Sequence, residues 1–136
     1  MVKVDNYEVA EGLYYSKDFA WIRIEGDKVR MGISDYTQKQ MREIVFAELP
    51  KPGTEIQQNK PYGSLESVKA VTDLVAAVSG TVEEVNAEVN SNPGILNEDP
   101  FGKGWLIIVK PVNLQAELAN LMSFDKAVEW HKNQGK

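Results

Sequence analysis

The sequence predicts a mainly β fold, a β-sandwich or barrel with short helices added at its C-terminal end. Many short apolar or alternating segments are separated by turn residues, which is typical of antiparallel β structure. The last part of the chain changes to leucines at helical spacing. With 136 residues, the chain is long enough to bury a core, and without cysteine that core needs no disulfides.

The first predicted strands form a hairpin. Residues 21–25 alternate apolar and polar side chains, a Gly-Asp pair follows as a turn, and residues 28–33 form the returning strand. The Ser-Asp pair that begins at Ser34 is a candidate N-cap for a short helix over residues 36–42.

Turn residues divide the middle of the chain into further strands. A Pro-x-Pro-Gly sequence stops the strand at 44–49, because proline restricts φ and glycine permits positive φ. Residues 90–94 are a loop by composition. The other strands are predicted over residues 63–68, 71–78, 81–86 and 105–110.

The C-terminal part predicts helices. Asn113 is a plausible N-cap for the first, and Ser123 for the second. We therefore expect a single domain over 1–136, with a core at about 14–111 and a C-terminal helical segment at about 113–133. The leucines that carry the helical spacing are Leu114, Leu118 and Leu121.

Composition removes several classes of function. A net charge of −5 argues against a nucleic-acid-binding surface, and it fits either a solvated acidic surface or docking onto basic partners. His131 is the sole histidine and no cysteine is present, so we expect no metal site. No apolar run is long enough to span a membrane and no signal peptide pattern opens the chain, so we expect a cytoplasmic protein that does not contact a membrane.

Lys69 is the candidate for chemistry. It lies between two predicted strands without glycine or proline, flanked by the small apolar residues Val68 and Ala70. A tight turn there would expose its ammonium group on a rigid base, which suits a lysine that another enzyme acylates. The position alone also fits an ordinary surface lysine in a hairpin.

A series of motifs along residues 14–125 favours a modified lysine over an ordinary surface lysine. In these motifs the sequence closely resembles the H-protein family of the glycine cleavage system. Biotin carriers, by contrast, usually place methionines beside the modified lysine. The matching stretches are Tyr14-Tyr15-Ser16-Lys17 with Trp21, Gly32-Ile33-Ser34-Asp35, Ile44-Val45-Phe46-Ala47-Glu48-Leu49-Pro50, Glu66-Ser67-Val68-Lys69-Ala70 with Asp73, Ser79-Gly80, Val85-Asn86, Asn97, Pro100 and Gly104-Trp105.

The resemblance implies a hybrid barrel-sandwich of lipoyl-domain type, a monomer, and lipoate joined to Lys69 by an amide bond. It implies a carrier and not an enzyme. A pyridoxal-phosphate glycine decarboxylase would load an aminomethyl group, a tetrahydrofolate-dependent aminomethyltransferase would unload it, and dihydrolipoamide dehydrogenase would reoxidise the arm. A lipoate-attaching enzyme would modify Lys69.

The family also holds the loaded arm in a cleft on the carrier, and there the sequence departs from the family pattern. Phe19 and Ala20 replace the His-Glu pair expected before the tryptophan, and Gln40 stands where a histidine is often found. Asp73 matches a cleft position, and Asp18 is a candidate to compensate for Ala20. Simple packing of Phe19 on the tryptophan and a solvated Asp18 are the alternatives.

These departures leave other functions open. One is an H-like lipoate-binding protein that serves sulfur oxidation or relays lipoate to other complexes, and another is a binding domain without lipoate. Arg42 is a further departure, because the family has a glycine before the next strand. An independent enzyme is the least supported alternative, since the sequence shows no set of nucleophile, base and oxyanion donors.

Overall fold

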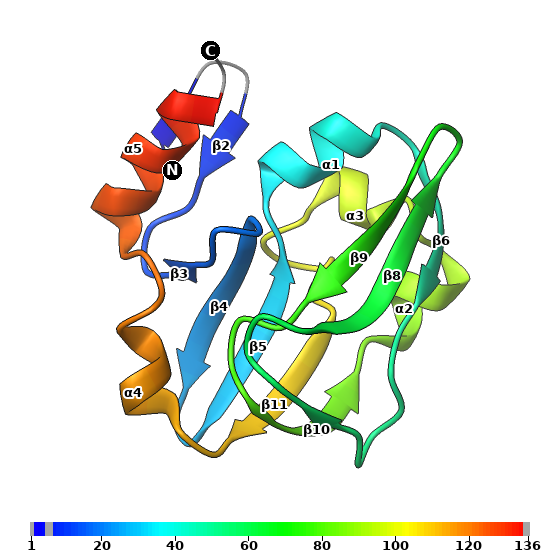
Figure 1. Ribbon diagram of the computed structural model, residues 1–136. Helices are drawn as coiled ribbons and strands as arrows, with labels where there is room; N and C mark the ends of the chain where they lie inside the picture. Colours follow the sequence, from blue (N-terminus) through cyan, green and yellow to red (C-terminus); the bar gives the residue numbers. More distant parts are fainter. Residues whose placement is uncertain (1, 5–6, 135–136) are drawn as a thin grey trace.

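The computed structural model describes residues 2–4 and 7–134 and builds them around three antiparallel sheets (Figure 1). The largest has the strand order β3 (Tyr14–Tyr15), β4 (Ala20–Glu25), β5 (Lys28–Ile33), β11 (Ile107–Pro111), β10 (Gly80–Val85) and β7 (Glu55–Ile56). The second has the order β6 (Ile44–Glu48), β8 (Pro61–Ser67) and β9 (Val71–Val75). The third pairs β1 (Val2–Val4) with β2 (Tyr7–Val9).

In the described part of the chain, five short helices join or flank the sheets. The first begins as the sequence predicts, because the Ser34 hydroxyl accepts the Thr37 N–H at 3.2 Å and so caps the helix. Within residues 2–4 and 7–134, no helix is long and apolar enough to cross a membrane. The helices are α1 (Asp35–Met41), α2 (Ala87–Ser91), α3 (Ile95–Glu98), α4 (Leu114–Leu118) and α5 (Phe124–Gln134).

The larger of two buried clusters, which we call the sandwich cluster, lies between the six-stranded and three-stranded sheets. Its buried members are all aliphatic, and most come from strands of both sheets; they include Ile22, Met31, Leu65, Leu74 and Ile107. Alternation along each strand puts these side chains on the facing sides of the two sheets. The predicted mainly β sandwich with short helices is therefore confirmed.

The second cluster, which we call the terminal cluster, joins the two ends of the chain. Helix α5 packs against β1, β2 and β3, and Figure 1 shows it in red beside the blue N-terminal strands. Tyr15 is anchored here, because its hydroxyl accepts the Ala10 N–H and donates to the Ala10 carbonyl, both at 2.8 Å. The buried members are Val4, Val9, Ala10, Leu13, Tyr15, Trp21, Phe101 and Ala127.

Several predicted boundaries are wrong, for local reasons. The strand expected over 71–78 ends at Val75, because the Ala76 N–H donates to the Lys60 carbonyl in a loop. The loop expected at 90–94 begins inside α2, which the Asn86 side chain caps. The strand predicted at 63–68 is observed at Pro61–Ser67. The strand predicted at 105–110 begins at Ile107, and the helix expected to reach Leu121 ends at Leu118.

Candidate functional site

Lys69 lies in the turn between β8 and β9, and Ser67 builds that turn. The Ser67 N–H donates to the Ala70 carbonyl at 2.8 Å, while the Ser67 hydroxyl accepts the N–H groups of Ala70 at 3.1 Å and Lys69 at 3.4 Å. Ser67 is only 5% exposed, whereas Lys69 is exposed. A buried serine therefore closes a turn that has neither glycine nor proline.

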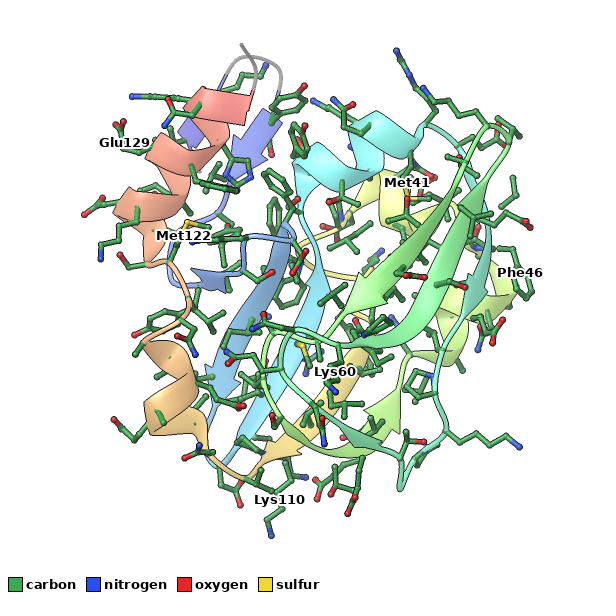
Figure 2. The ribbon with its side chains drawn as sticks, viewed as in Figure 1. Met41, Phe46, Lys60, Lys110, Met122 and Glu129 are labelled. Carbon is green, nitrogen blue, oxygen red and sulfur yellow. The ribbon has the colours of Figure 1, made fainter. Side chains whose placement is uncertain are left out.

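Exposed apolar side chains surround the turn. Val68 is 74% exposed and Val71 is 66% exposed. Phe46 on β6 is 53% exposed and pairs across the sheet with Glu66, which in turn pairs with Val71. Figure 2 shows Phe46 at the outer edge of the three-stranded sheet. The turn thus presents an amine beside apolar surface and a carboxylate.

A cleft of about 210 Å³ opens between α1, the start of β4 and the β8–β9 hairpin. Figure 2 shows Met41, one of its lining residues, between α1 and that hairpin. The structure brings together here all the residues for which the sequence analysis expects a cleft role. They are Asp18, Phe19, Ala20, Gln40 and Asp73.

One wall of the cleft is aromatic. The Phe19 ring stacks on Tyr36 with ring centroids 4.3 Å apart. It does not stack on Trp21, which lies in the terminal cluster with its ring centroid 6.4 Å from that of Phe101. Phe19 has a φ of 63°, a left-handed conformation that is costly for a bulky residue. Its carbonyl accepts the Ser34 N–H at 2.9 Å, so the same residue also contacts the start of α1. The stacking and the hydrogen bond hold Phe19 in this strained conformation.

The other predicted cleft residues differ in exposure. Ala20 is 8% exposed and adds a small apolar surface. Asp18 and Asp73 are exposed carboxylates at the cleft, and Asp73 pairs across the hairpin with Ser64. Gln40 is exposed, and its amide donates to the Tyr7 hydroxyl at 3.0 Å. The cleft therefore combines apolar walls with carboxylates near solvent.

Several residues that line this cleft are not among those expected from the sequence. Tyr36 lies in the predicted helix, and an aromatic residue on its first turn is the signal that could have drawn attention to it. Tyr62 lies just before the predicted strand, and burial raises the pKa of its phenol above the usual value, which keeps it neutral. Others are Thr37, Met41, Leu65 and Thr72.

Arg42, the departure from the family pattern at the end of α1, has an unusual backbone conformation. Arg42 ends α1 with φ 67° and ψ −143°, a conformation that glycine adopts without strain. This geometry explains why the family has a glycine at the position that Arg42 occupies here.

Within the described residues, no group of three or more His, Asp or Glu side chains could hold a metal ion.

Comparison with known proteins identifies the family. The model of the family described as "Glycine cleavage H-protein" matches residues 13–134. The chain belongs to the glycine cleavage H-protein family. A glycine cleavage system H protein of Geobacillus thermodenitrificans is 50% identical over 114 residues, which are 84% of this chain and 89% of that protein. A probable H protein of Pyrococcus horikoshii is 44% identical over 133 residues, which are 97% of this chain and 98% of that one.

A solved structure supports the same assignment at the level of the fold. The crystal structure of a glycine cleavage system H protein from Mycobacterium marinum matches with a TM-score of 0.82 and 31% identity, covering 94% of this chain and 100% of that one. Members of this family are lipoyl carriers of the glycine cleavage system that interact with its other components, and they are not themselves catalytic. The carrier role expected from the sequence is confirmed.

Proposed function

We propose that Lys69 carries the lipoyl group through an amide at Nζ. We further propose that the chain moves an aminomethyl group from glycine decarboxylase to the tetrahydrofolate-dependent aminomethyltransferase. The observation that supports this best is an exposed lysine, on a turn fixed by the buried Ser67, at the end of a hairpin that also lines an apolar cleft. When attached, the lipoyl group would supply a disulfide that takes the one-carbon cargo on one sulfur, and the dithiol left after unloading would be reoxidised by dihydrolipoamide dehydrogenase.

The residues of the turn fit such a group. Acylation removes the charge of Lys69, so the arm can enter apolar surroundings, and Val68 and Val71 provide apolar surface where it leaves the protein. The firm turn matters because an arm on a fixed base reaches its partners at a high effective concentration.

The cleft lies within reach of the arm. Asp73 lies on β9 four residues after Lys69, so even a fully extended chain would separate the two residues by no more than roughly 13 Å. The apolar wall of Phe19 and Tyr36 would exclude water from a group placed there. Asp18 and Asp73 supply carboxylate oxygens that can accept hydrogen bonds from a protonated amine on the cargo.

The attachment is tested by intact mass. We expect protein incubated with lipoate, ATP and a lipoate-attaching enzyme to gain one lipoyl increment, and Lys69→Arg to gain none, because the guanidinium cannot form this amide. Lys60→Arg is the matched control, since Lys60 is also exposed and lies just before β8. An increment retained in Lys69→Arg, or no increment in the wild type, would contradict the proposal.

The cargo is tested separately. We expect the lipoylated protein, with its arm in the oxidised disulfide form, to become loaded with an aminomethyl group when glycine and the decarboxylase are present, because the electron pair left by decarboxylation opens the disulfide to one S–C bond and one thiol. We expect it to lose the group to the aminomethyltransferase with tetrahydrofolate, which leaves the dithiol. The apolar Phe19 and Ala20 in the cleft favour a second candidate, a lipoyl carrier with a different cargo. Full lipoylation without any loading would support that candidate and contradict aminomethyl transfer.

A further inference from the structure

His131 is the sole histidine of the chain, and helix α5 buries it completely, with 0% of its surface exposed. Its Nδ1 lies 2.7 Å from the Ala127 carbonyl. Because a carbonyl only accepts hydrogen bonds, Nδ1 carries the proton, and the neutral ring leaves Nε2 without one. Within the described part of the chain, this buried Nε2 has no hydrogen-bond partner.

Aromatic rings enclose the imidazole, and they connect it to the cleft. Tyr15, Phe19 and Tyr36 meet it edge-on, with centroid distances of 5.9, 5.2 and 6.1 Å and interplanar angles of 80° to 86°. Phe19 and Tyr36 are the stacked pair that lines the cleft. His131 therefore lies directly behind the aromatic wall.

Protonation of His131 would disturb this packing. Protonation would add an N–H and a positive charge at Nε2, which has no hydrogen-bond partner among the described residues. The protonated ring would therefore gain a partner only if α5 moves or water enters. Burial lowers the pKa of His131 below its ordinary 6.5, and the Ala127 hydrogen bond and the charge of Asp35 oppose that shift.

Asp35 on α1 is the charged group that acts on the ring, and its carboxylate lies 3.5 Å from the ammonium group of Lys39 on the same helix. Tyr36 on α1 and Tyr15 on β3 meet the imidazole with their aromatic rings, and burial raises the pKa of the Tyr15 phenol. The strands β1 and β2, which pack on α5, carry Lys3 and Glu8 with exposed side chains.

We propose that His131 is a positioning residue for the arm cleft. In its neutral form it holds the rings of Phe19 and Tyr36 in place from behind. When it is protonated, the wall loosens and the cleft retains the arm less well. The statement about the rings of Phe19 and Tyr36 applies to the unmodified protein, while the statement about the arm rests on the proposed function.

The wall is tested by NMR on the unmodified protein, where a single histidine makes the assignment direct. We expect the His131 ring resonance to titrate below pH 6.5, and the ring resonances of Phe19 and Tyr36 to shift with the same midpoint. Protection of the Ser34 amide, which donates to the Phe19 carbonyl, should fall over the same range.

Two variants separate positioning from stability. His131→Phe keeps an aromatic ring but cannot titrate, so the Phe19 and Tyr36 shifts should become independent of pH. Val128→Ala loosens the same helix, because Val128 packs on the terminal cluster, but it leaves the titration in place. The inference is overturned if the wall resonances stay still while His131 titrates, or if they still titrate in His131→Phe.

The consequence for the arm needs the loaded, lipoylated protein. Spontaneous loss of the aminomethyl group should accelerate in the wild type as the pH falls through the His131 midpoint, and this added acceleration should be absent from His131→Phe. Equal pH profiles in the two proteins would overturn this part. Failure of lipoylation would count against the proposed function and would leave the NMR result intact.

Discussion

The sandwich cluster and the terminal cluster differ in chemistry as well as in place. The buried side chains of the sandwich cluster are all aliphatic. The terminal cluster contains Tyr15, Trp21 and Phe101. The buried side-chain nitrogens without partners in the described residues, Trp130 Nε1 and His131 Nε2, both belong to α5, the helix that packs on it. A core without polar groups is insensitive to pH, whereas one that buries an imidazole is not.

The difference shows that the two clusters have separate structural roles. The sandwich cluster holds the hairpin rigid, because Leu65 of β8 and Leu74 of β9 are buried in it while Lys69 stays in solvent. The terminal cluster adjoins the cleft wall through His131 and Phe19. Four predictions test this division, in order of decreasing effect.

The largest effect is expected from Leu65→Ala in the sandwich cluster. Leu65 is 0% exposed, so the substitution leaves a cavity and should lower the free energy of unfolding by about 2–5 kcal/mol. Urea denaturation of the two proteins measures the difference. A loss below 1 kcal/mol would show that the sheets repack freely and do not fix the hairpin.

A smaller effect is expected from Tyr15→Phe in the terminal cluster. The phenylalanine keeps the ring but leaves the buried N–H and carbonyl of Ala10 without their partner, which should cost about 1–3 kcal/mol. The same denaturation experiment applies. An unchanged midpoint would mean that water replaces both hydrogen bonds and that this cluster tolerates local opening.

A pH change between 7.5 and 5.5 should act on helix α5 and on the terminal cluster that it packs against. The pKa of His131 is lowered in the folded state, so the unfolded chain takes up its proton first as the pH falls through 6.5. Stability should therefore be full above that pH and should decrease as the pH falls towards the folded-state pKa. Melting temperatures at pH 7.5 and 5.5 test this, and His131→Leu should remove the part of the decrease that His131 causes.

The smallest effect is expected from Lys69→Arg, which touches neither cluster. The side chain is exposed at the turn, so the melting temperature should change by less than about 2 °C even though lipoylation is abolished. Differential scanning calorimetry measures it. A larger decrease would show that Lys69 also supports the fold.

Elements that depend on local sequence patterns were predictable, whereas elements that depend on contacts between distant parts of the chain were not. The strands at 21–25 and 28–33 and the cap at Ser34 were predictable, because alternation and N-capping are local patterns. The family motifs also pointed to Lys69 and to five residues that prove to line one cleft. The N-terminal strands β1 and β2 were not predicted, because they are three residues long and form against each other and against the helices α1 and α5, which lie far away in the sequence.

The sequence by itself determined the mainly β class, the family and the candidate lysine, since these depend on residue order and periodicity. Only the tertiary structure decided that Ser67 closes the turn with its side chain, and that His131 stands behind Phe19 from more than a hundred residues away. Such contacts depend on how two elements pack in space, and no local pattern encodes them. Lys69 thus follows from sequence, while the wall of its cleft follows from the packing of the chain ends.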